Sequence, residues 1–127
     1  MKAYLAARYS RRAELCGYRD ALEEIGYEVT SRWLDGGHDV MLGAEDFSET
    51  CAQYAQEDLD DIDCAEVLIL FTDPPGSEAP RGGKHVETGY ALGTMKPVWV
   101  VGPRTNLFYH LPNIHCYETW DDLISRL

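Results

Sequence analysis

The sequence feature that most constrains the fold is a continuous apolar run at residues 67–72, VLILFT. Apolar side chains at every position, rather than at alternate positions, are typical of a strand that is buried on both faces in the middle of a parallel sheet. Residues 97–102, PVWVVG, have the same character. Both runs therefore favour an α/β protein in which helices cover a parallel sheet.

Strand and helix patterns alternate along the rest of the chain. We expect further strands at residues 2–7, 27–32 and about 114–117, and helices from Ser10 as N-cap to Gly26, at 47–62, at 85–92 and from about 118 to 127. This order predicts a single domain, residues 1–127, that is a doubly wound three-layer α/β sandwich with a five-stranded parallel sheet, of the flavodoxin-like type. In such sheets, ligands bind outside the carboxyl ends of the strands.

The composition excludes several classes of function. With 22 acidic and 11 basic side chains the formal net charge is −11, which argues against a general binder of nucleic acid or of anionic membranes. The 4 cysteines and 4 histidines show no metal-binding spacing, so we expect no metal and no other cofactor. The sequence shows no signal-peptide pattern and no apolar run of about 20 residues, so we expect a cytoplasmic protein.

Glu87 is a candidate nucleophile. Gly82 and Gly83 predict a tight turn, and the helix that follows them carries Glu87 within its first turn or so. The free N–H groups of a helix N-terminus favour an ionised carboxylate, and an ionised Glu at the mouth of an α/β fold suits nucleophilic catalysis. The alternative is that Glu87 only complements the helix dipole.

A second carboxylate lies on the inward face of its helix. In the helix at 47–62, Asp58 falls between Tyr54 and Ile62 on the apolar stripe, whereas Asp60 and Asp61 point elsewhere and are expected to be solvated. An inward carboxylate is costly unless it is paired or functional. Asp58 is therefore either a site residue or a structural cap or ion pair at the helix edge.

Three arginines flank the turn between the first strand and the first helix. Arg8, Arg11 and Arg12 either bind a small anion such as a phosphate, which a helix N-terminus favours, or are solvated surface charges. Trp33 lies beside the glycine-containing loop after the second strand. We interpret Trp33 as a packing anchor for that loop, and the alternative is a lid over an aromatic ligand.

Four segments carry motifs: YLAARYSRR at residues 4–12, D-L-x-x-I-x-x-A at 58–65, G-x-x-x-E-x-G-Y-A-L at 83–92 and G-x-x-x-N-L at 102–107. Together they resemble the nucleoside 2-deoxyribosyltransferase family over almost the whole chain. The resemblance implies that Glu87 is the nucleophile, that Asp58 helps with proton transfer and sugar binding, and that Tyr4 touches the nucleophile. It also implies that Gly83 lies at the substrate and that Asn106 reaches into a neighbouring subunit's site, which would make the protein a homo-oligomer.

One position departs from the family pattern. Six residues before Glu87 the transferases often carry an Asp that binds the base, whereas this chain has Arg81. The related nucleoside 5′-monophosphate N-glycosidases lack that Asp and bind a phosphate. Arg81, together with the three arginines of the first turn, suits a phosphorylated substrate.

The resemblance implies an enzyme that acts on a small nucleoside or nucleotide. Such an enzyme cleaves the N-glycosidic bond of 2′-deoxyribonucleosides through a covalent deoxyribosyl-Glu intermediate and transfers the deoxyribose to an acceptor base. The alternatives are a hydrolase of 2′-deoxynucleoside 5′-monophosphates and a non-catalytic nucleotide-binding module. An NAD glycohydrolase is disfavoured, since no glycine fingerprint for a dinucleotide follows the first strand.

Overall fold

The computed structural model, which describes residues 1–38, 43, 45–77 and 82–127, has one sheet of five parallel strands. The strands are β1 (Lys2–Ala6), β2 (Glu28–Val29), β3 (Val67–Phe71), β4 (Val98–Val101) and β5 (His115–Tyr117). Their order is β2-β1-β3-β4-β5, so the direction in which strands are added reverses between β1 and β3. The predicted five-stranded parallel sheet is confirmed.

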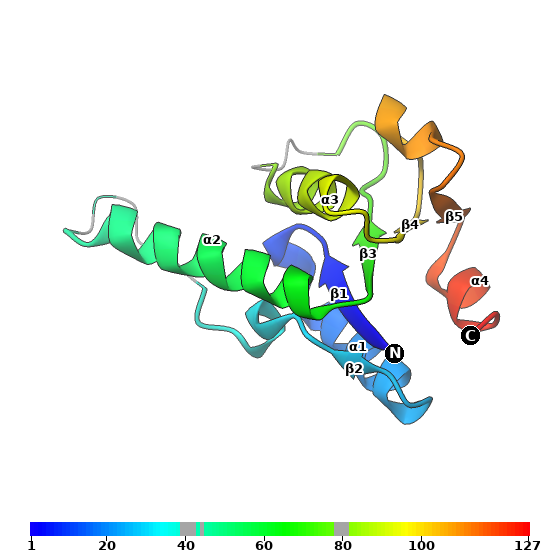
Figure 1. Cartoon of the computed structure of the whole chain (residues 1–127), viewed down its shortest axis with the longest axis horizontal. Coiled ribbons are helices and arrows are strands. Elements are labelled where there is room, and N and C mark those ends of the chain that lie inside the picture. Colours follow the sequence, from blue (N-terminus) through cyan, green and yellow to red (C-terminus); the bar gives the residue numbers. More distant parts are fainter. Residues whose placement is uncertain (39–42, 44, 78–81) are drawn as a thin grey trace.

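Helices cover both faces of this sheet (Figure 1). The chain forms α1 (Arg12–Glu24), α2 (Phe47–Cys64), α3 (Gly83–Gly93) and α4 (Trp120–Ile124), with the short 3₁₀ helices η1 (Tyr9–Arg11), η2 (Arg32–Asp35) and η3 (Leu107–His110). Helices α2 and α3 lie on one face, and α1 and α4 on the other. This is the three-layer, flavodoxin-like α/β sandwich that the sequence predicts.

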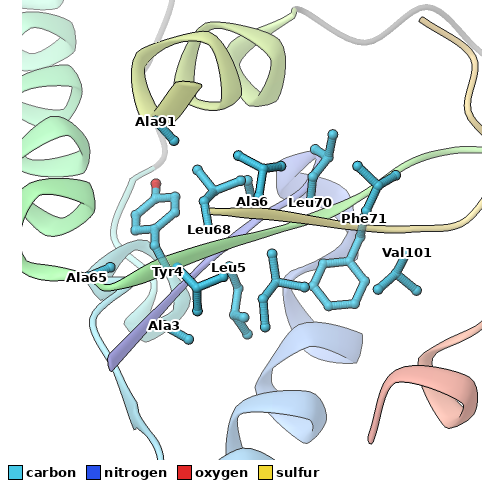
Figure 2. Close-up of a cluster of buried hydrophobic side chains, with 14 of the residues drawn as sticks. Ala3, Tyr4, Leu5, Ala6, Ala65, Leu68, Leu70, Phe71, Ala91 and Val101 are labelled. Carbon is cyan, nitrogen blue, oxygen red and sulfur yellow. The ribbon is translucent and has the colours of Figure 1, made fainter. Parts of the chain in front are cut away.

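The core consists of side chains from both faces of the central strands. Every residue of β3 is buried, as its unbroken apolar run predicts. Successive side chains point to opposite faces, so Tyr4 and Leu68 face α3 whereas Leu5 and Phe71 face the layer of α1 and α4 (Figure 2). The small Ala91 is fully buried on the sheet side of α3, which lets this helix lie close to β1.

The second strand is shorter than predicted, because at Ser31 a side-chain hydroxyl takes the place of a main-chain carbonyl as the partner of β1. We expected residues 27–32, but β2 contains only Glu28–Val29. The N–H of Leu5 in β1 donates to the Ser31 Oγ at 2.6 Å instead of to a main-chain carbonyl. The chain then turns into η2, where Trp33 is buried and its Nε1 donates to the Leu5 carbonyl at 2.8 Å. Trp33 is thus the packing anchor that the sequence indicated.

Two helices begin later than predicted. Ser10 does not cap a helix, because it lies within η1 and α1 begins only at Arg12. The C-terminal helix begins at Trp120 and not near residue 118. Its first turn is fixed by Thr119, whose Oγ1 accepts a hydrogen bond from the Asp122 N–H at 3.2 Å.

Asp61 is buried, contrary to the prediction that it is solvated. Its exposed fraction is 4%. Oδ2 accepts a hydrogen bond from the main-chain N–H of Arg32 at 3.0 Å, and Oδ1 accepts one from the Arg32 Nε at 2.8 Å. The apolar stripe of α2 does not reveal this position, because η2 packs against α2 through polar contacts. Asp61 therefore fixes η2 to α2.

We predict that Asp61→Ala lowers the free energy of unfolding by about 2 kcal/mol, because the partly buried N–H of Arg32 loses its acceptor. Chemical denaturation followed by circular dichroism measures the change. Asp60→Ala is the matched control: Asp60 is exposed and accepts a hydrogen bond from Gln56 at the surface, so its loss should change the free energy by less than about 0.5 kcal/mol. Equal effects of the two substitutions would contradict the role assigned to Asp61.

Candidate active site

The site is built on Tyr4, in the central strand β1, and Glu87, in α3. Tyr4 is fully buried and points toward α3 (Figure 2), and its hydroxyl donates a hydrogen bond to Oε2 of Glu87. Tyr4 is fixed because β1 pairs with β3, with Leu68 opposite it. The fold therefore brings together two of the residues that the sequence singled out, although they lie 83 positions apart.

Glu87 is less acidic than predicted. Helix α3 begins at Gly83 and has no acidic residue in its first turn, so Glu87 lies beyond the free N–H groups of the helix N-terminus. Burial raises the pKa of Glu87 to about 8, the hydrogen bond from Tyr4 opposes this rise, and the charge of Asp58 adds to it. The expectation that the helix dipole keeps Glu87 ionised is therefore wrong: Glu87 retains its proton at neutral pH.

Asp58, in α2, is the second carboxylate of the site. Its side chain is 25% exposed, but Oδ1 is buried and accepts no hydrogen bond from the residues that the structure describes. Burial raises the pKa of Asp58 to about 6, and the charge of His38 opposes this rise. Burial is also the largest cause of the raised pKa values of Glu87 and Tyr4, and the charge of Asp58 adds to both. Asp58 and Glu87 therefore form an interacting pair.

Two interacting carboxyl groups of this kind hold one proton between them at neutral pH. Both are protonated below about pH 6, one proton remains between about 6 and 8, and none remains above about 8. The one-proton state offers an anionic oxygen and an acidic proton in one site. Nucleophilic displacement with assistance from a general acid needs this combination.

The three arginines of the first turn have contacts inside the protein. Arg11 lies 3.3 Å from Oδ1 of Asp73, and Arg8 lies 3.7 Å from Oδ2 of the same residue. The Nε of Arg12 donates to the carbonyl of Leu34 at 2.9 Å, which directs Arg12 toward η2. Arg8 and Arg11 therefore meet at one carboxylate, whereas Arg12 is separate from them.

Asp73 and Lys84 complete this cluster, although the sequence analysis did not single them out. Lys84 is buried in the first turn of α3, and its Nζ donates to Asp73, just after β3. Burial opposes ionisation of Asp73, but the hydrogen bond and charge of Lys84 and the charges of Arg8 and Arg11 outweigh it and lower the pKa of Asp73. An acid directly after a buried strand was a usable signal for Asp73. Nothing in the sequence distinguishes Lys84 from a surface lysine.

The other candidate residues lie at element boundaries or beyond the described ones. Gly83 is the first residue of α3, and Gly82 before it has a φ of 89°, a conformation that glycine favours and that turns the chain into the helix. Asn106 caps η3, since its Oδ1 accepts a hydrogen bond from the Phe108 N–H at 2.9 Å. Arg81 lies outside the residues that the structure describes.

A cleft of about 440 Å³ lies at the edge of the α1 and α4 layer and does not coincide with the carboxylate pair. Its walls include Arg11, Phe71 and Trp120 and include neither Tyr4 nor Glu87. We place the candidate site at the pair, because two acids that interact through their charges and have shifted pKa values are a stronger sign of chemistry than volume alone.

Within the described residues, no group of three or more His, Cys, Asp or Glu side chains is arranged to hold a metal ion. Across residues 1–38, 45–77 and 82–127, no helix is both long enough and apolar enough to cross a membrane.

Two solved structures have the fold of this chain. A 2-deoxyribosyltransferase from Bacillus psychrosaccharolyticus matches with a TM-score of 0.73 and 22% identity, over 98% of this chain and 90% of its own. The CMP N-glycosidase BcmB from Clostridium botulinum matches with a TM-score of 0.64 and 20% identity, over 99% of this chain and 97% of its own. No protein-family model and no curated protein sequence matches the chain. The two enzymes are of the kinds that the sequence resemblance names, and at these identities the likeness establishes a shared fold.

Proposed function

We propose that the protein cleaves the N-glycosidic bond of 2′-deoxyribonucleosides and transfers the deoxyribose to an acceptor base. The observation that carries the proposal is the hydrogen bond from buried Tyr4 to Glu87, with Asp58 near enough to interact with both. The motifs of the sequence support it, and so does the fold shared with a 2-deoxyribosyltransferase and a CMP N-glycosidase.

Glu87 is the nucleophile of this mechanism. Its ionised carboxylate attacks C1′ while the C1′–N bond breaks, and the bonding electron pair leaves with the base. Asp58 gives its proton to the departing base nitrogen. Tyr4 fixes the direction of the Glu87 carboxyl group through its hydrogen bond. The product of this half-reaction is a deoxyribosyl ester of Glu87.

The second half-reaction releases the enzyme. An acceptor base attacks C1′ of the ester, the carboxylate of Glu87 departs, and the carboxylate of Asp58 takes the proton that the acceptor loses. Water in place of the base completes hydrolysis instead. Each displacement inverts C1′, so both outcomes retain the configuration of the substrate.

A hydrolase of 2′-deoxynucleoside 5′-monophosphates is the second candidate. Arg8, Arg11 and Lys84 gather around one carboxylate, Asp73, beside the start of α3, and Arg11 also pairs with Glu14 at 2.8 Å. Cationic side chains grouped at the start of a helix favour a phosphate. Chromatography of reactions with nucleosides and with monophosphates, each with and without a free acceptor base, separates the two candidates. Base exchange on nucleosides supports transfer, whereas base release from monophosphates alone supports hydrolysis.

We predict that Glu87→Gln lowers the rate of base release or exchange by about 1,000-fold or more, because an amide cannot form the glycosyl ester. Steady-state assays read by chromatography measure the loss. Glu24→Gln, at the exposed end of α1, is the matched control and should retain the wild-type rate. A Glu87→Gln enzyme with near-normal turnover would disprove the mechanism.

The same substitution carries its own control for folding. The folded-state pKa of Glu87, about 8, lies above the ordinary value of 4.5, so the wild type loses stability as the pH rises from about 4.5 to about 8. Gln has no charge to bury. The Tm of Glu87→Gln should therefore rise relative to that of the wild type between pH 5 and pH 8.5, and a difference that does not change with pH would contradict the burial of Glu87.

We predict a bell-shaped dependence of kcat/KM on pH, with limbs near 6 and 8. The productive state has Glu87 ionised and Asp58 protonated, so the pair must hold one proton. The rate rises as the first proton leaves near pH 6 and falls as the last leaves near pH 8. A profile that rises steadily from pH 5 to 9 would show that Asp58 gives no proton.

We also propose a homo-oligomer in which the face around Asn106 meets a neighbouring subunit. Leu107 and Phe108, at the start of η3, are 76% and 57% exposed, and large apolar side chains grouped in water favour an interface. Sedimentation velocity should show that Phe108→Glu shifts the protein toward monomer, whereas Met95→Glu, exposed just after α3, does not. A monomeric wild type at micromolar concentration would contradict the assembly.

A further inference from the structure

His38 is a buried histidine without a hydrogen-bond partner. Its side chain is 10% exposed, and neither ring nitrogen makes a hydrogen bond with the residues that the structure describes. An imidazole always carries at least one N–H donor, and a buried donor without an acceptor costs about 1–3 kcal/mol. A group of this kind in a folded protein requires an explanation.

The ring of His38 is held against α2, next to Asp58. It packs on the ring of Tyr54, with the centroids 4.2 Å apart. The Tyr54 hydroxyl also donates to the Gly37 carbonyl at 2.5 Å and so ties the residue before His38 to the same helix. Tyr54 and Asp58 are one helical turn apart, which places both on one side of α2. His38 therefore approaches Asp58 from a fixed direction.

The Oδ1 of Asp58 is the acceptor that fits this donor. It too is buried without a hydrogen bond, and it lies 3.8 Å from the Nε2 of His38, about 0.6 Å beyond the usual limit for a hydrogen bond. The Oε1 of Glu57 is nearer, at 3.4 Å, but Glu57 is partly exposed and lies 3.9 Å from Arg32. Water and Arg32 can satisfy Glu57. Among the residues that the structure describes, His38 is the group that lies against the buried Oδ1 of Asp58.

We propose that His38 is a positioning residue for Asp58, whose Oδ1 accepts a hydrogen bond from Nε2–H of His38 once Asp58 has protonated the departing base. This inference rests on the proposed function and deepens it. The proton that moves is that of Asp58, and His38 neither gains nor loses one. His38 supplies a hydrogen-bond donor to the carboxylate that forms.

The groups around Asp58 explain why its ionised form needs a hydrogen-bond donor such as His38. The charged or ionisable groups that interact with Asp58 come from β1, from η2, from the residues after η2, from α2 and from α3: Tyr4, Arg32, His38, Glu57, Asp61 and Glu87. Burial and the neighbouring acids disfavour ionised Asp58, and His38 is the strongest of the groups that favour it. Loss of His38 would leave a buried carboxylate among other acids.

The test compares His38→Gln and His38→Ala with His115→Gln, a control at an exposed position of β5. Nuclear magnetic resonance of carboxyl-labelled protein, assigned with Asp58→Asn, gives the pKa of Asp58. We expect this pKa to rise by about 1 in both His38 variants, since both remove the His38 interaction that lowers it, and to stay unchanged in the control. We also expect His38→Ala to lower kcat about 10-fold with little change in KM. His38→Gln keeps an N–H near the position of Nε2 and should recover part of that rate.

The outcomes distinguish this inference from the proposed function. If the wild type is active and the His38 variants change neither the pKa of Asp58 nor kcat, His38 does not position Asp58. The same conclusion follows if the pKa of Asp58 rises while kcat stays unchanged. If the wild type releases no base from any nucleoside or monophosphate, the proposed function fails, and an unchanged pKa of Asp58 in the variants then overturns the contact with His38 independently. If His38→Ala does not fold, His38→Gln gives the same pKa test.

Discussion

The contact on which the candidate site depends is the hydrogen bond between Tyr4 and Glu87. Tyr4 belongs to the strand at which the strand order reverses, and its hydroxyl points toward the helices on that face, where Glu87 of α3 accepts its hydrogen bond. Ala91 lets α3 lie close to the sheet, and the helix then carries the Glu87 carboxyl over β1 rather than into water. The raised pKa of Glu87 follows from this packing, because a charge placed there loses most of its hydration.

The start of α3 is fixed by a second interaction, between Lys84 and Asp73. Asp73 lies two residues after β3, so the register of that strand also sets the position of the helix that carries Glu87. Lys84 and Glu87 lie three residues apart and are therefore neighbours along α3. In a protein of net charge −11, the first turns of α3 thus carry one cation, Lys84, that belongs to a group of cations around Asp73, and one acid, Glu87, that belongs to the carboxyl pair. A ligand with an anionic end and a centre that becomes cationic during reaction matches this distribution of charge.

Periodicity was sufficient to predict the sheet, the three layers and the inward position of Asp58, because each of these depends on which side chains leave water. It could not predict contacts that join a side chain to a distant main chain. The short β2 results from the contact of the Ser31 hydroxyl, and the burial of Asp61 results from its contact with the N–H of Arg32. Neither contact leaves a periodic pattern of residue types in the sequence. The ionisation of Glu87 was predicted wrongly because the helix begins earlier than expected, which leaves burial as the larger effect. His38 stands in an irregular loop, where only three-dimensional placement reveals its neighbour.

The pKa values of the pair also imply that, without substrate, the protein holds its proton on the other carboxyl group than the proposed mechanism requires. Glu87 binds a proton more tightly than Asp58, whereas the mechanism needs Glu87 ionised and Asp58 protonated. A difference of about 2 between the two values corresponds to a cost on the order of 2–3 kcal/mol for exchanging the proton. Positive charge that develops at C1′ stabilises ionised Glu87 directly, and this interaction is absent before the glycosidic bond begins to break. Under the proposed mechanism, the arrangement therefore favours ionised Glu87 in the transition state more than in the protein without substrate, which is the condition for catalysis rather than for tight binding.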